Sequence, residues 1–170
     1  SFPLASGQQP YFYNHRRTGR PQTSPQESAF KARYREVEHR ALYPFGHGLG
    51  YGDVVYGPTQ ASSEAMGWNA TLTLRATLAN RGARAMREVA QLYIHQRVAA
   101  IARPVRELRG FKAVELQPGE TATVEFRISR SDLAYVGAEG KAVTEPGWFD
   151  VVIAPSAVGG VSVALRLLAN

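Results

Sequence analysis

Residues 70–79, which read ATLTLRATLA, decide the fold of this chain. Apolar side chains at Ala70, Leu72, Leu74, Ala76 and Leu78 alternate with Thr71, Thr73, Arg75 and Thr77. Because successive side chains of a β-strand point to opposite faces, this alternation predicts a strand with one buried and one solvent-facing side. The turn-forming residues 80–82, NRG, end it.

The same period of two continues toward the C-terminus. Residues 88–96 carry apolar side chains on both faces, which predicts a central strand covered on both sides. Residues 110–116 and 121–128 flank the turn QPGE at 117–120, and we expect them to form a hairpin. The predicted inward side chains of the later strands are Ala122, Val124, Phe126, Ile128, Phe149, Val151, Ile153, Val161, Val163, Leu165 and Leu167.

With residues 53–56 as the first strand, the pattern gives about seven strands between residues 53 and 170, separated by Gly, Pro and Asn turns. Short strands at this spacing, with no long helical period between them, predict an all-β fold, an antiparallel β-sandwich. Residues 1–52 differ, since five prolines at positions 3, 10, 21, 25 and 44 exclude a long helix. We expect an extended N-terminal tail that wraps on another surface.

Composition narrows the function classes. The chain has 170 residues and a net charge of +6, but its arginines are scattered and form no basic run, which argues against nucleic-acid binding. No apolar run reaches the roughly 18 residues of a membrane span. Cysteine is absent, which excludes a disulfide framework and thiolate metal sites. The chain begins with Ser1, and no charged segment followed by an apolar segment comes after it, so we interpret this end as processed or excised.

Residue types that carry chemistry are present without the spacing that chemistry needs. No two histidines lie at the i, i+4 spacing of a helical metal site, so we predict no metal and no cofactor. The three aspartates, Asp53, Asp132 and Asp150, fall at a strand start, a turn and an outward strand position, so we predict no catalytic carboxylate pair. Aromatic residues gather in the tail, where they favour anchoring to a protein interface, with sugar stacking as the alternative.

Four longer strings resemble, in order, the C-terminal region of family 3 glycoside hydrolases, above all the bacterial periplasmic β-glucosidases. They are GQQPYFYNHRRTGRP (7–21), ARYREVEHRALYPFGHGLGY (32–51), ARPVRELRGFKAVELQPGETATVEF (102–126) and DLAYVGAEGKAVTEPGWFDVVIA (132–154). The resemblance implies a fibronectin type III/immunoglobulin-like sandwich over residues 53–170. It also implies that residues 1–52 are the interdomain tail and linker, coming from the end of the parent enzyme's α/β sandwich domain.

The resemblance further implies a parent enzyme that hydrolyses terminal β-glucosidic bonds with retention, through catalytic residues outside this chain. We therefore expect a non-catalytic structural or docking module, inactive alone, in a periplasmic or secreted bacterial protein, with the cytoplasm left open. Its partners would be the parent's catalytic domains, with a homodimer contact left open and neither nucleic acid nor membrane involved. The alternative function is an independent carbohydrate-binding module.

The tail aromatics and the arginines of these strings are the candidates for interdomain contacts. They are Tyr11, Tyr13, His15, Arg20, Tyr43, Phe45, His47, Arg103 and Arg109.

Overall fold

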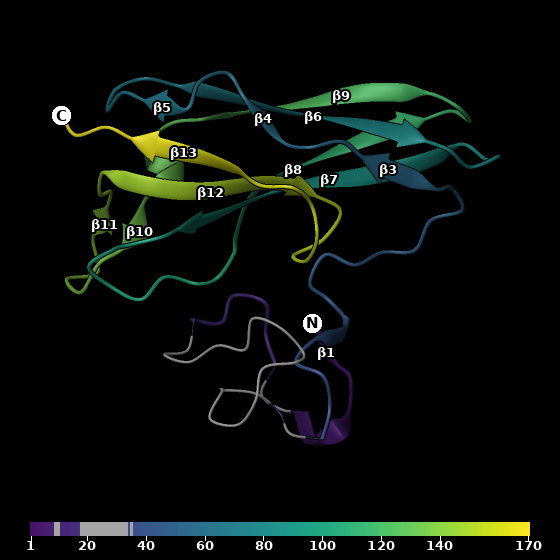
Figure 1. Ribbon diagram of the computed structural model, residues 1–170, viewed down its shortest axis with the longest axis horizontal. Helices are drawn as coiled ribbons and strands as arrows, with labels where there is room; N and C mark the ends of the chain where they lie inside the picture. Colours follow the sequence, from purple (N-terminus) through teal and green to yellow (C-terminus); the bar gives the residue numbers. More distant parts are fainter. Residues whose placement is uncertain (9–10, 18–33, 35) are drawn as a thin grey trace.

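The computed structural model describes residues 1–8, 11–17, 34 and 36–170, and its main body is a pair of stacked β-sheets (Figure 1). The first sheet has five strands in the order β5-β13-β12-β7-β8. Their bounds are β5 (Ala65–Met66), β13 (Val163–Leu167), β12 (Gly147–Ala154), β7 (Met86–Gln96) and β8 (Glu107–Leu116). Strand β5 runs parallel to β13, and the other pairs are antiparallel.

The second sheet is built around one long strand, β6 (Leu72–Asn80). Strands β3 (Val54–Tyr56) and β4 (Gln60–Ala61) pair with successive parts of β6, while β9 (Thr121–Ile128) pairs along nearly all of it. The antiparallel sandwich predicted from the sequence is confirmed. Among the described residues its two sheets hold nine strand segments where we expected about seven, because β4 and β5 are two-residue pieces at sheet edges.

The remaining elements are short. Two ribbons of two strands each pair β1 (Phe2–Pro3) with β2 (Ala41–Tyr43), and β10 (Tyr135–Val136) with β11 (Ala142–Val143). The other secondary-structure elements among the described residues are two 3-10 turns, η1 (Ser6–Gln8) and η2 (Arg130–Leu133). No helix among the described residues has the length and apolar character needed to cross a membrane.

The core between the sheets follows the predicted alternation. The even-numbered side chains of β6 are buried against β7, β12 and β13, and the odd-numbered ones face outward. The fully enclosed side chains of this core include Leu74, Leu78, Ala90, Leu116, Phe149, Val151, Ile153 and Leu165. One inward prediction is wrong, because Val161 is 62% exposed in the segment that precedes β13.

The predicted hairpin at residues 117–120 is also wrong. Strand β8 pairs with β7 in one sheet and β9 pairs with β6 in the other, so the turn carries the chain between sheets. At this crossing the buried side chain of Asn80 donates to the carbonyl oxygens of Leu116 at 3.2 Å and Gln117 at 3.2 Å. Its backbone also bonds Glu120 and Gly119. These bonds join the turn to the end of β6.

Strand β7 is the covered central strand that the sequence predicts. Its Leu92 and Ile94 lie in the core, while Tyr93 on the opposite face is also fully buried. A second apolar cluster surrounds Tyr93 on the outer face of the five-stranded sheet, and the segment around Tyr13 and Phe45 packs against it. The tail, in the purple to blue part of Figure 1, therefore covers a second face of the sandwich.

Candidate functional site

Three aromatic rings join the N-terminal tail to the sandwich. Tyr13 and Phe45 stack with ring centroids 4.0 Å apart, and Tyr13 meets Tyr93 edge to face at 6.4 Å. Tyr93 stands on the outer face of β7 because its neighbours Leu92 and Ile94 fill the core. Burial raises the pKa of Tyr93 to about 12, so its hydroxyl is protonated at neutral pH and donates to Oε1 of Gln91 at 2.5 Å.

Gln91 ties the tail backbone to the same face. Its Nε2 donates to the carbonyl oxygens of Gly46 at 3.1 Å and Pro155 at 2.6 Å, while the amide of Ala157 donates to the carbonyl of Phe45 at 2.8 Å. Gly46 has a φ of +79°, and a Cβ there would collide with Gln91. Position 46 therefore requires glycine both for its backbone conformation and for this close approach.

The tail also lies along the segment that precedes β8. Arg16 and Pro104 form an isolated antiparallel bridge, and the amide of Val105 donates to the carbonyl of His15 at 2.9 Å. The next side chain, Arg106, donates to the carbonyl oxygens of Ala157 and Gly159. Its pKa is lowered by burial. These contacts bring residues 13–16 and residues 104–106 into one surface.

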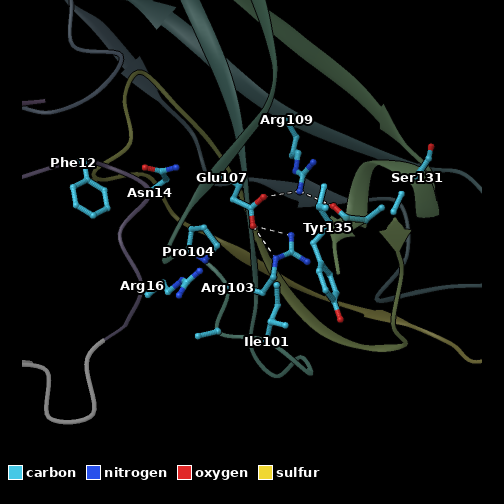
Figure 2. A pocket seen from close by; sticks show the side chains of 14 residues that line it. Phe12, Asn14, Arg16, Ile101, Arg103, Pro104, Glu107, Arg109, Ser131 and Tyr135 are labelled. Carbon is cyan, nitrogen blue, oxygen red and sulfur yellow. Dashed lines mark hydrogen bonds and ion pairs between the residues drawn. The ribbon is translucent and has the colours of Figure 1, made fainter. Parts of the chain in front are cut away.

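An open cavity of about 850 Å³ lies where this part of the tail meets the sandwich (Figure 2). We call it the arginine groove. Tail residues Phe12, Asn14 and Arg16 line one side in Figure 2, and Ser131 and Tyr135 lie on the other. Arg103, Glu107 and Arg109 lie between the two sides. The groove is therefore made by segments far apart in the sequence.

The carboxylate of Glu107 holds two guanidinium groups together in the arginine groove. Its Oε1 accepts from Arg103 at 2.8 Å, and its Oε2 accepts from Arg109 at 2.6 Å. Arg103 is nearly fully buried, also donates to Oε1 of Gln96 at 2.7 Å, and lies 4.8 Å from the centre of the Tyr135 ring. Arg109 also donates to the carbonyl of Ala134 at 2.8 Å. Its buried Nε has no hydrogen-bond partner in the described structure.

The structure groups the nine predicted contact residues as follows. Tyr13 and Phe45 pack on the outer face of the sandwich, and Tyr43 stacks on His47 with centroids 5.0 Å apart. Tyr11 and His15 both lie about 6 Å from the ring of His39, at 6.0 and 6.3 Å. Arg103 and Arg109 meet at Glu107. Arg20 lies outside the described residues. Their contact with other domains stays a prediction.

Sequence reasoning missed the roles of Glu107, Gln91 and Tyr93. The pattern in residues 88–96 predicts a second covered face, which includes Tyr93, but it does not identify the tail as the cover. Glu107 carries a usable signal, because RELR at 106–109 places it beside arginine, yet the pairing that matters includes the more distant Arg103.

Two of the three aspartates and one histidine are engaged in hydrogen bonds within the chain. Asp150 accepts two bonds from Nε and Nη2 of Arg97. Asp132 accepts from the backbone and hydroxyl of Ser129. Nδ1 of His95 lies 2.9 Å from the carbonyl of Pro104. Within the described ranges, no group of three or more His, Asp or Glu residues is arranged to hold a metal ion.

The comparisons with known proteins identify the domain. Residues 88–157 match the family model of the fibronectin type III-like domain. The chain carries a fibronectin type III-like domain. It is 36% identical over 153 residues to a periplasmic β-glucosidase of Salmonella typhimurium, covering 90% of this chain and 20% of that protein. It is 33% identical over 156 residues to a β-xylosidase of Formosa agariphila, covering 92% of this chain and 21% of that protein.

Solved structures agree with these relatives. A β-glucosidase from Listeria innocua, crystallised with glucose, superposes with a TM-score of 0.88 at 32% identity, covering 99% of this chain and 23% of that one. The chain thus spans about a fifth of the length of the curated relatives named above. The fibronectin type III-like domain and its tail match the C-terminal region of family 3 β-glucosidases and β-xylosidases, which confirms the resemblance seen in the sequence.

Proposed function

We propose that this chain is the non-catalytic C-terminal docking module of a family 3 glycoside hydrolase. In the proposed enzyme, residues 53–170 are the fibronectin type III-like sandwich and residues 1–52 are the tail that connects it to the catalytic domains. The observation that carries the proposal is the stack of Tyr13 and Phe45 against Tyr93. This stack fixes the connecting tail to the sandwich, so that the two move as one body.

The proposed reaction of the longer enzyme is retaining hydrolysis of terminal β-glucosidic bonds, as the names of several relatives suggest. That reaction uses two carboxyl groups about 5 to 5.5 Å apart across one sugar. Glu107, Asp132 and Asp150 are each occupied by hydrogen bonds from neighbouring side chains. This supports placing the catalytic residues in the longer enzyme outside this chain.

A docking role is supported by the apolar side chains that the tail leaves uncovered. Phe2 is 69% exposed and Tyr51 is 85% exposed, and Phe12, Leu42, Tyr43 and Leu49 are exposed as well. Large apolar side chains gathered on one segment mark a surface that another protein surface covers. In the proposal the catalytic domains cover it, and Tyr11, His15, Tyr43 and His47 belong to this contact.

The sugar-binding alternative has less support. A sugar ring stacks on a free aromatic face, and both tryptophans have guanidinium groups beside them. Arg97 and Arg166 lie 5.7 and 5.8 Å from the centre of the Trp148 ring, and Arg130 lies 5.2 Å from Trp68. These cations compete for the ring faces that a sugar would need. For location, the name of the Salmonella relative supports the periplasm.

Two measurements test the proposal. The purified 170-residue chain is assayed with aryl β-glucosides and titrated with cello-oligosaccharides while tryptophan fluorescence is followed. The expected result is neither turnover nor binding. In the longer enzyme, deletion of residues 53–170 is expected to lower the thermal midpoint and the soluble yield. Turnover by the chain alone, or an enzyme unaffected by the deletion, would contradict the proposal.

A further inference from the structure

The arginine groove carries more positive charge than its own residues neutralise. Its charged lining residues are Arg16, Arg103, Arg109 and Glu107, so three positive charges face one negative charge and a net charge of +2 remains. Both oxygens of Glu107 already accept from Arg103 and Arg109. Arg16, at the tail side of the groove, is exposed and has no ion-pair partner among the described residues.

Arg109, which lines the groove, keeps one unpaired donor inside the chain. Nε of Arg109 is buried and has no acceptor among the described atoms. A buried N–H without a partner costs about 1–3 kcal/mol, and here it leaves the positive charge of Arg109 incompletely compensated within the chain. Arg16, in contrast, is exposed, and its guanidinium presents donors in a planar fork that fits a carboxylate with two parallel bonds.

The walls of the groove are apolar and aromatic. Phe12 of the tail lines it, as do Ile101 and Tyr135 of the sandwich. Walls of this kind lower the local dielectric and strengthen the attraction between the unpaired arginine charge and an incoming anion. The cavity of about 850 Å³ is larger than a single small anion requires and accommodates several side chains.

We propose that the arginine groove receives an acidic segment of the catalytic part of the longer enzyme, whose carboxylates pair with the exposed Arg16. The inference rests on the proposed function and names the surface and the chemistry of the contact. A polypeptide occupant is favoured because the matched relatives extend over about four times the length of this chain beyond it. One wall of the groove also belongs to the tail that leads to that part.

The first test is site-specific photo-cross-linking in the longer enzyme. A benzophenone-bearing amino acid replaces Ile101, which is partly exposed in the groove, and in a second variant it replaces Arg81. Arg81 is an exposed residue before β7, at the opposite end of that strand from the groove. Position 101 is expected to cross-link to a catalytic-part peptide that contains Asp or Glu, and position 81 is not.

The second test is charge reversal with a matched control. Arg16→Glu is expected to lower the cross-linking yield from position 101 by about fivefold, because a rim charge now repels the acidic segment. Arg81→Glu makes the same charge change elsewhere and is expected to leave the yield unchanged. The isolated Arg16→Glu chain is expected to keep its thermal midpoint, since this side chain has no internal ion pair to lose.

The outcomes separate this inference from the proposed function. A peptide without Asp or Glu at position 101, or no cross-link there at all, overturns the acidic-segment proposal. An equal loss of yield with Arg16→Glu and Arg81→Glu overturns it too, because the effect is then one of total charge. The docking function itself is tested separately, by the thermal midpoint and soluble yield of the longer enzyme after deletion of residues 53–170.

Discussion

Tyr13 of the tail and Phe45 stack face to face, with their ring planes 14° apart and their centroids at 4.0 Å. Together they cover Tyr93 on the outer face of the five-stranded sheet. The stack packs this part of the N-terminal tail onto the sandwich. The orientation of the whole module in a larger enzyme would therefore depend on a few aromatic contacts outside the main core.

Removing one ring of the stack is expected to loosen the tail. Tyr13→Ala should lower the free energy of unfolding by about 1–3 kcal/mol, because the apolar contact with Phe45 and Tyr93 is lost. Hydrogen exchange at residues 44–47 should accelerate, while exchange in β6 stays slow. Tyr51→Ala is the control, since Tyr51 is largely exposed. Unchanged exchange at residues 44–47 would show that the stack does not hold the tail.

Substitutions at two glycines distinguish the cost of a positive φ from the cost of a steric collision with Gln91. Gly46→Ala places a methyl group against Gln91 in a residue with φ of +79°, whereas Gly119→Ala has a similar φ of +75° and no neighbour within 4 Å. Both variants bear the backbone cost of about 1 kcal/mol, and only the first disturbs the bond from Gln91 to the tail. The denaturant midpoint of Gly46→Ala should therefore fall clearly below that of Gly119→Ala. Equal midpoints would mean that the collision relaxes without cost.

The sheet-to-sheet crossing should depend on Asn80. Asn80→Ala leaves the carbonyl oxygens of Arg84, Leu116 and Gln117 without their donor. Because unpaired buried acceptors are costly, we expect the free energy of unfolding to fall by about 1–3 kcal/mol in total. Equilibrium unfolding in urea measures this change. Asn69→Ala, at an exposed position, is the control and should be neutral. A neutral result for Asn80→Ala would leave the sheet pairing itself as the cause of the crossing.

The arginine groove should depend on the charge of Glu107. Glu107→Gln keeps the shape but weakens two charge-assisted bonds and leaves the buried Arg103 guanidinium poorly compensated. We expect a loss of about 2–3 kcal/mol in unfolding free energy. Glu125→Gln, in the exposed pair with Arg75, is the comparison and should change stability little, because solvent screens that pair. Similar losses for the two variants would argue against a special role of the groove.

Alkaline pH should weaken the tail contact through Tyr93. Burial raises its pKa in the folded chain to about 12, above the value of about 10 for an exposed tyrosine. The unfolded chain therefore releases its proton first, and the associated stability is lost as pH rises from about 10 to 12. Urea midpoints measured across that range should fall less steeply for Tyr93→Phe than for the natural chain. Parallel curves would contradict this origin of the pH dependence.

The sequence by itself determined the sandwich and most of its core. The alternation in residues 70–79 and the two covered faces of residues 88–96 predicted which side chains face inward, because a strand's period is a local property of the chain. The four quoted strings also resembled the enzyme family whose C-terminal region this chain matches.

Only the tertiary structure decided which strands pair and what covers the outer face. The sequence of the turn at residues 117–120 fits a hairpin as well as a crossing between sheets. In the structure, the buried amide of Asn80 binds this turn to the end of β6. In the same way, Glu107 joins Arg103 to Arg109, and Tyr93 is covered by Tyr13 from the distant tail. Which buried polar and aromatic groups become partners depends on how distant segments pack together in space. A period-two pattern describes only local strand geometry, so it cannot predict these partners.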